Sequence, residues 1–369
     1  MTETAAPAQA FANSGKFFNV LGLALKNAGL TLATLTVYRF WARTAMRRRI
    51  WSRIWVMGDP LEYTGTAGEL FRGFLISLPC FFLPAIFVFY IAPFAMDPVG
   101  AAWLTFGFYV VVVPTMAAAR YWMRRYQLSR TRWRGIRLGL AGSAWGFGFA
   151  SWGWTILQTL SLGWYTPVAR MNRARLLWEN ARFGDQPFQF IEDGRSPASR
   201  LWWPFALGWF GMGLAYLFAA VITVGVMGAM LGAGFDPESG APSTAQSFAM
   251  VFTAFLSFAI FATAFWAPYN AAAMNRIASL ITLDGARFRL RAKTFSLYFV
   301  TLAGWLMIIL SVGLLTPMAG FLQVRYVARR LEIVGEPQFA QIGQSVVAEG
   351  RAGESLGDAF DLDMGVGII

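Results

Sequence analysis

The sequence contains no histidine and only one cysteine, Cys80. The missing histidine removes the commonest general base and the commonest metal ligand. One cysteine cannot form an internal disulfide, and without histidine beside it, zinc, haem or iron–sulfur sites held by protein ligands are not expected. Cys80 lies in an apolar run and is interpreted as a small buried hydrophobic residue. We therefore expect no enzyme, no catalytic residue, no metal and no cofactor.

Charged residues are also scarce. They make up 14% of the 369 residues, against about 25% in ordinary soluble proteins, while 57% of the residues are hydrophobic and 17% are aromatic. This composition predicts an all-α polytopic membrane protein. Four apolar runs reach the roughly 20 residues that a membrane crossing needs; they cover 70–96, 99–119, 201–233 and 245–268. Three weaker runs cover 17–38, 144–168 and 294–317.

The net charge of +12 is not interpreted as a sign of nucleic-acid binding, because the basic residues cluster directly after apolar runs. The loops at 96–100 and 233–247 contain no Lys or Arg and carry Asp97, Asp236 and Glu238. The positive-inside rule then predicts basic stretches and a C-terminus in the cytoplasm. Residues 1–15 lack the pattern of a cleavable signal peptide, so we expect internal insertion signals. The expected location is the inner membrane of a bacterium.

One pattern occurs five times along the chain: an apolar segment, a Pro or Trp anchor, a basic stretch, and a Gly that leads into alternating apolar residues. Anchor and Gly are 17 residues apart in three units, 18 in another and 21 in the last. Spacing this regular indicates internal repeats. The anchors are Trp41, Pro114, Pro167, Pro268 and Pro317, and the glycines are Gly58, Gly135, Gly184, Gly285 and Gly335. The units divide the chain into a disordered N-terminus (1–15), repeat 1 (16–141), repeat 2 (142–292), a half repeat (293–345) and a disordered acidic tail (346–369).

The three weaker segments leave two topologies open. If all seven segments cross, the basic stretches after Pro114 and Pro167 lie on opposite sides of the membrane, although both belong to one repeat. If the weak segments are interfacial or re-entrant, four crossings remain and every basic stretch lies on the cytoplasmic side. In each of the first two weak segments, polar residues fall on one helical face, which favours the second topology. The face includes Lys26 and Asn27 in the first segment, and Gln158 and Thr159 in the second.

Turn-forming residues begin each segment that follows the basic stretches, as in GDPLEY at 58–63 and GARFRL at 285–290. Apolar residues then alternate, which is typical of short strands. Two readings remain open: a small cytoplasmic sheet built from these strands, or extended connectors. If they form a sheet, we expect at least two of the segments to pair with each other.

The basic stretches also offer candidate ligand-binding residues. Arg and Lys beside membrane spans normally set topology. Arginine interleaved with tryptophan also suits anionic lipid headgroups, which makes anionic membrane lipids the expected partner. The candidate lipid-binding residues are Arg47, Arg48, Trp51, Arg120, Arg173, Arg276 and Arg325. The candidate polar pathway is Lys26, Asn27, Gln158 and Thr159, with snorkelling to water as the structural alternative for Lys26.

The motif TLTVYRFWAR at 34–43, followed by RRRIW and by GDPLEYTGT at 58–66, resembles the YjgN-like family of bacterial inner-membrane proteins. The later SLGWYTP segment resembles a repeat of the same family. The resemblance covers about 16 to 345 and implies an inner-membrane location, with no catalytic residues to carry over. The function we expect is passage or binding of a small solute or lipid at the repeat interface. The alternative is a non-transporting envelope protein that organises anionic lipids or a partner through its basic face.

Overall fold

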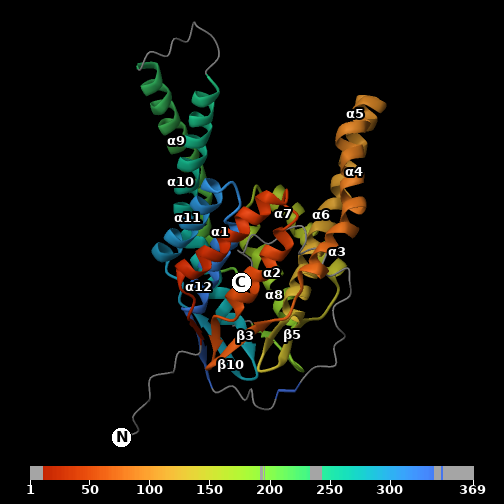
Figure 1. The fold of residues 1–369 in the computed structure, drawn as a ribbon, viewed down its shortest axis with the longest axis vertical. Coiled ribbons are helices and arrows are strands. Elements are labelled where there is room, and N and C mark those ends of the chain that lie inside the picture. Colours follow the sequence, from red (N-terminus) through yellow and green to blue (C-terminus); the bar gives the residue numbers. More distant parts are fainter. Residues whose placement is uncertain (1–10, 192–193, 195, 233–242, 336–341, 344–369) are drawn as a thin grey trace.

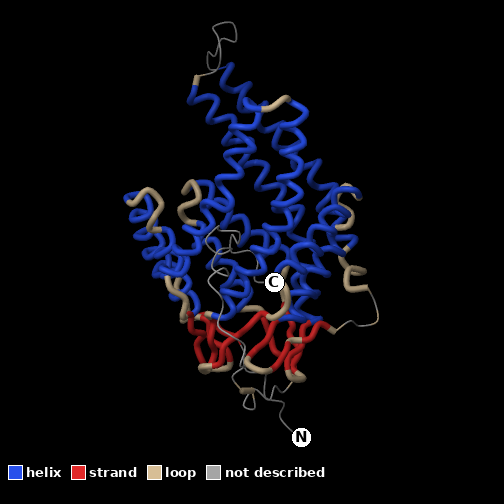
Figure 2. The backbone as a smooth tube through the Cα atoms, turned by 90° about the vertical axis from the view of Figure 1, so that its right-hand side faces the viewer, coloured by secondary structure: helices blue, strands red, loops and turns tan. Residues whose placement is uncertain are grey.

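The computed structural model describes residues 11–191, 194, 196–232, 243–335 and 342–343 (Figure 1). The described part is mostly helical, and its short strands gather at one end (Figure 2). The helices are α1 (Phe17–Ala33), α2 (Arg39–Trp51), α3 (Ala67–Ser77), α4 (Leu83–Ile86), α5 (Ala92–Ala95), α6 (Pro98–Ser129), α7 (Ala144–Leu160), α8 (Thr166–Asn180), α9 (Trp202–Gly232), α10 (Thr244–Leu280), α11 (Thr294–Leu310) and α12 (Thr316–Ala328), with π-helical turns η1 (Leu78–Phe82) and η2 (Phe87–Ile91). The strands are β1 (Phe11–Asn13), β2 (Ile54–Val56), β3 (Asp59–Tyr63), β4 (Thr131–Trp133), β5 (Ile136–Leu140), β6 (Ala181–Phe183), β7 (Gln186–Pro187), β8 (Gln189–Phe190), β9 (Ile281–Leu283), β10 (Ala286–Leu290) and β11 (Leu331–Val334).

Some sequence predictions fall on residues outside this description. They are residues 1–10 of the N-terminus, the acidic tail at 346–369, Asp236 and Glu238 of the second acidic loop, the side chain of Cys80, and the strand predicted after Gly335. The prediction of a disordered N-terminus is wrong for residues 11–13, because they form β1 and pair with β2.

The strands are antiparallel and follow one another in chain order. Strands β1 to β7 form one sheet and β8 to β11 another among the described residues. The segment 188–191 connects the two sheets. The Phe188 N–H donates to the Ala181 carbonyl in the first sheet, and the Ile191 N–H donates to the Leu280 carbonyl beside the second. The sheet expected from the sequence is therefore present. Among the described residues the predicted strands do not pair with one another, because each pairs with a short strand before a glycine turn, as β3 pairs with β2 and β4.

Every helical segment in the described part leaves this strand layer and returns to it. The pairs α1–α2, α7–α8 and α11–α12 each join two strands, as do the longer α3–α6 and α9–α10 segments. In particular, the stretches on either side of α7–α8 end in β5 and β6, which pair with each other. The seven-crossing alternative needs those stretches on opposite sides of the membrane, so the sheet is inconsistent with it. The three shorter pairs have the connectivity of re-entrant or interfacial hairpins.

Of the helices in the described residues, α6, α9 and α10 are long and apolar enough to cross a membrane. Only 6–17% of the residues in their apolar windows are buried within the molecule, as expected of surfaces that face lipid. The segment predicted at 70–96 is helical but divided into short elements by η1 and η2, near Pro79, Pro84 and Pro93, which have no N–H to donate. The fourth crossing therefore stays a prediction. Figure 1 shows the α5–α6 and α9–α10 tips at the end away from the strands.

The same turn ends α1, α7 and α11. In each, a backbone N–H bonds to the carbonyl five residues earlier: Thr36 to Thr31 at 2.7 Å, Gly163 to Gln158 at 2.7 Å, and Gly313 to Ile308 at 2.8 Å. The residue before each of these donors is left-handed, as in a Schellman motif. The chain then reverses into α2, α8 or α12.

We predict that Thr36→Gly stabilises the protein by about 1 kcal/mol. Thr36 has φ +73°, where its counterparts are Gly163 (φ +90°) and Gly313 (φ +85°). A β-branched residue is strained in this region and glycine is not. The measurement is the thermal unfolding of detergent-purified protein. The reciprocal Gly163→Thr variant should lose a similar amount, and a destabilised Thr36→Gly would contradict the strain.

Candidate anion-binding cavity

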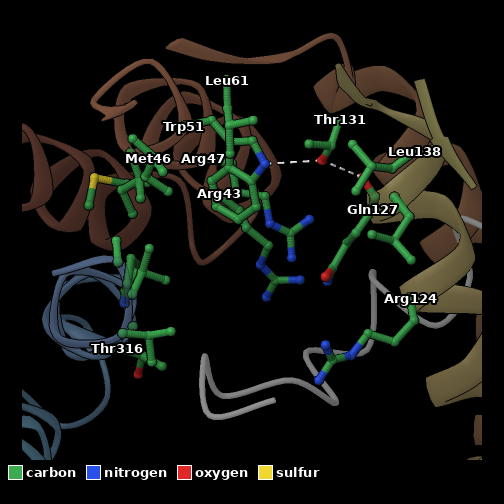
Figure 3. Close-up of a pocket in the computed structure, with 18 of the residues that line it drawn as sticks. Arg43, Met46, Arg47, Trp51, Leu61, Arg124, Gln127, Thr131, Leu138 and Thr316 are labelled. Carbon is green, nitrogen blue, oxygen red and sulfur yellow. Dashed lines mark hydrogen bonds between the residues drawn. The ribbon is translucent and has the colours of Figure 1, made fainter. Parts of the chain in front are cut away.

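A cavity of about 720 Å³ lies between several of the helices and the strands. It is bounded by α1, α2 and α12, by the ends of α6 and α8, and by several strands. Figure 3 shows side chains from α2, α6 and α12 projecting toward it. Its volume is within the 300–1,000 Å³ range of small-molecule sites.

Helix α2 supplies a stripe of three arginines and one tryptophan. Arg39, Arg43, Arg47 and Trp51 all line the cavity. Their spacing of four residues places them on one face of the helix. The three arginines are half-buried, so their charges lie partly out of bulk water.

The facing side of the cavity adds two further arginines. Arg124 projects from the last part of α6 across from the α2 arginines (Figure 3), and Arg182 of β6 is also in the lining. The described lining residues include no Asp or Glu. Because an arginine side chain stays protonated at any physiological pH, the cavity concentrates permanent positive charge. Partial burial strengthens the field of that charge relative to water.

The remaining walls are largely apolar. Met46 and Ile50 of α2, Leu138 of β5, and Val324 and Val327 of α12 all contribute to the lining. These side chains offer a surface that favours hydrocarbon. The cavity therefore combines arginine, which binds phosphate or carboxylate oxygens, with walls that suit an acyl or aromatic group.

Hydrogen bonds fix the wall between α2 and the sheet. The Trp51 Nε1–H donates to Thr131 Oγ1 at 3.0 Å, and this hydroxyl donates to the Gln127 carbonyl at 2.8 Å (Figure 3). On the α1 side, the buried Asn27 donates through Nδ2 to the Ala42 carbonyl at 3.4 Å. The lining from Arg39 to Trp51 extends along α2 for about 18 Å.

A family model described as "Bacterial protein of unknown function (DUF898)" matches residues 8–359. The chain belongs to the DUF898 family. It is also 29% identical over 142 residues to the inner membrane protein YjgN of Salmonella typhimurium, in an alignment of 37% of this chain and 32% of that protein. The chain thus spans about a third of that curated relative. No solved structure matches.

The YjgN-like resemblance is thereby confirmed. The named relative and the three long apolar helices of this DUF898 protein support an inner-membrane location. Within the described residues, no three or more His, Cys, Asp or Glu side chains form a group that could hold a metal ion.

Three of the predicted site residues line the cavity of the DUF898 protein: Arg47, Trp51 and Asn27. Others lie elsewhere. Arg48 is exposed and donates to the Gly65 carbonyl at 2.8 Å. Arg276 is only 9% exposed and donates to the Pro197 carbonyl at 3.3 Å. The structure does not bring the rest into the cavity; these are Lys26, Arg120, Gln158, Thr159, Arg173 and Arg325.

Arg173 and Gln158 do meet, but in a separate contact between α7 and α8. The Arg173 guanidinium donates to Gln158 Oε1 at 2.9 Å and to Thr155 Oγ1 at 3.1 Å. Burial lowers the pKa of Arg173, and the nearby charge of Arg120 lowers it further. Arginine pKa values are high enough that the side chain remains charged. The polar face of this weak segment is therefore used within its own hairpin. Lys26 and Thr159 are exposed on the surface of the molecule.

Sequence reasoning missed Arg39, Arg43, Arg124 and Arg182. The signal for two of them was present, because Arg39 and Arg43 continue the four-residue spacing of Arg47 and Trp51. The distance of an arginine from its anchor, by contrast, gives no information on the direction of its side chain. Arg182 had no helical signal, since it follows α8 on a three-residue strand.

Proposed function

We propose that this inner-membrane protein binds an anionic amphiphile in the central cavity. One observation carries the proposal: five arginines and a largely apolar wall line the same 720 Å³ space. Charge-assisted hydrogen bonds would hold a phosphate or carboxylate head, and the walls would take its apolar part. The described lining contains no histidine, cysteine or carboxylate side chain. Such a lining suits a binding site better than an enzyme active site.

Binding is also better supported than passage. Helices α9 and α10, which form one of the two long hairpins, contribute no residue to the described lining. The cavity instead lies beside the strands and the shorter hairpins. A passage through the membrane would place a polar space between the long helices. We therefore propose a binding site in which the repeated hairpins surround the ligand.

The test is the affinity of purified protein for a fluorescent phosphatidylglycerol in neutral detergent. The Arg43→Gln/Arg47→Gln double variant should bind at least about tenfold more weakly, because each charge-assisted hydrogen bond contributes about 1.5–3 kcal/mol and 1.4 kcal/mol corresponds to tenfold. The matched control is Arg287→Gln/Arg289→Gln, which removes the same charge from exposed positions on β10. Its affinity should equal that of the unmodified protein.

Two further outcomes identify the ligand source. Competition by glycerol phosphate alone would indicate a soluble anion, whereas competition by phosphatidylglycerol and not by phosphatidylcholine would indicate an anionic lipid. Equal affinity of both double variants and the unmodified protein would reject the cavity as the site. A loss confined to the Arg287→Gln/Arg289→Gln variant would favour the alternative function, in which the exposed basic face organises anionic lipids.

We also propose that the strands, the basic helices and the C-terminal part lie in the cytoplasm. The sheet holds the basic stretches together on one side, and the positive-inside rule assigns that side. In a Cys80→Ser background, Arg175→Cys on the exposed face of α8 should not react with a membrane-impermeant thiol reagent in intact cells.

The control for this labelling is Val99→Cys, at a position that is 65% exposed near the α5–α6 tip. This tip lies at the opposite end from the strands (Figure 1), so the variant should react in intact cells. Reaction at Arg175→Cys without permeabilisation would show that the orientation is reversed.

A further inference from the structure

The segment that follows the last described residue has a composition complementary to the cavity. Residues 346–369 contain one Arg and five carboxylates, although the whole chain has a net charge of +12. Toward the end, acidic and apolar residues alternate in DAFDLDM at 358–364. The segment therefore has both features that the cavity suits: anionic groups for the arginines and apolar side chains for the walls.

The chain before this segment is fixed close to the cavity. Ile342 is buried in the main hydrophobic core, and the Gly343 carbonyl accepts a hydrogen bond of 3.1 Å from the Asp185 backbone N–H. Asp185 lies three residues after Arg182, which lines the cavity. Three residues span at most about 11 Å, so Gly343 and Arg182 are within roughly 15 Å of each other.

The remaining chain is long enough to reach every part of the cavity. After Gly343 the sequence continues to residue 369. At about 3.3 Å per extended residue, six residues cover the roughly 18 Å length of the α2 lining. The sequence leaves more than a dozen residues between Gly343 and the DAFDLDM segment, so the chain is long enough for this segment to reach the arginines.

We propose that the acidic segment at 346–369 occupies the arginine-lined cavity and competes with the ligand for it. The competition rests on the proposed function, whereas the occupancy does not. A tethered segment acts at a high effective concentration, in the millimolar range for short linkers, so weak contacts suffice for substantial occupancy. External ligand then binds only when it displaces the segment.

The first experiment measures phosphatidylglycerol affinity with the segment altered. Removal of residues 346–369 should raise the affinity about tenfold. The full-length Asp358→Asn/Asp361→Asn/Asp363→Asn variant should raise it in the same direction, which guards against a truncated protein that folds poorly. If the unmodified protein binds phosphatidylglycerol and neither change raises its affinity, the competition is refuted.

The second experiment locates the segment without any ligand. In the Cys80→Ser background, Leu362→Cys is combined with Thr316→Cys, which lies in the cavity lining. The control combines Leu362→Cys with Phe248→Cys, which is 70% exposed on α10 and is not part of the lining. Mild oxidation should form a disulfide in the first pair and not in the control.

The two experiments separate the two proposals. A disulfide to Thr316→Cys in a protein that binds no phosphatidylglycerol in any variant would support the occupancy and reject the proposed lipid ligand. Absence of the disulfide, or equal yield with the Phe248→Cys control, would overturn the occupancy whatever the affinity measurements show.

Discussion

Gly148→Leu is expected to push α7 away from α6 and to lower the free energy of unfolding by about 3 kcal/mol. A Cβ atom at Gly148 would lie 2.7 Å from the Pro114 carbonyl oxygen and 3.1 Å from the Ala118 Cβ. The carbonyl is part of the α6 backbone and cannot rotate away as a side chain could. Small residues allow close helix approach in membrane proteins, and leucine removes that approach here. Thermal unfolding in detergent measures the loss.

Gly153→Leu provides the control on the same helix. A Cβ atom at Gly153 meets no other atom within 4 Å. Glycine is also a poor helix former, so leucine there should leave stability unchanged or raise it by up to about 1 kcal/mol. If the Gly148→Leu and Gly153→Leu proteins unfold at the same temperature, α6 and α7 do not approach as closely as the structure shows.

The sequence predicts the strand layer because the turns have a local chemical signature. At Met57–Gly58, Arg134–Gly135 and Asp284–Gly285 both residues have positive φ, the geometry of tight hairpin turns. Glycine at the second position is readable from sequence, and the alternation after it is long enough to recognise. The strands before these turns were missed because three residues, such as Ile54–Val56, are too few to show a period.

For the membrane segments, apolar composition predicts some of the helices but not how the chain is divided within them. The apolar runs at 99–119, 201–233 and 245–268 coincide with the long helices α6, α9 and α10. The run at 70–96 is equally apolar, yet its prolines and π-helical turns divide it, and hydropathy does not register that division. The weak segments were resolved by neither length nor polarity. Each lies in a helix pair whose two flanking strands pair with each other: β1 with β2, β5 with β6, and β10 with β11.

The cavity was only partly predictable for a similar reason. The α2 stripe is a local helical pattern, and Arg47 and Trp51 were recognised within it. Arg124 and Arg182 face the same space only because α6, α8 and β6 are brought together by the fold. Arg47 and Arg173 each lie six residues after an anchor, Trp41 or Pro167. At that offset α2 presents its arginine to the cavity, whereas α8 presents Arg173 to the polar face of α7.

This difference makes Arg173→Lys the second large effect that we expect. Lysine keeps the charge and therefore the orientation in the membrane. It cannot reproduce the planar fork that donates to Gln158 and Thr155. Two charge-assisted hydrogen bonds at about 1.5 kcal/mol each predict a loss of about 3 kcal/mol in the free energy of unfolding. Because Arg173 does not line the cavity, phosphatidylglycerol affinity measured below the unfolding temperature should not change.

Arg325→Lys is the matched control, since it makes the same exchange in the basic helix α12. Arg325 also lies outside the cavity lining, and like Arg173 it was named from the sequence as a candidate lipid-binding residue. A purely topological role for both arginines predicts unchanged stability in both variants. The contacts seen here predict a loss at Arg173 alone, because its guanidinium joins α8 to α7 through two side chains. Equal thermal unfolding of the two lysine variants would show that Arg173, too, serves only to orient the chain.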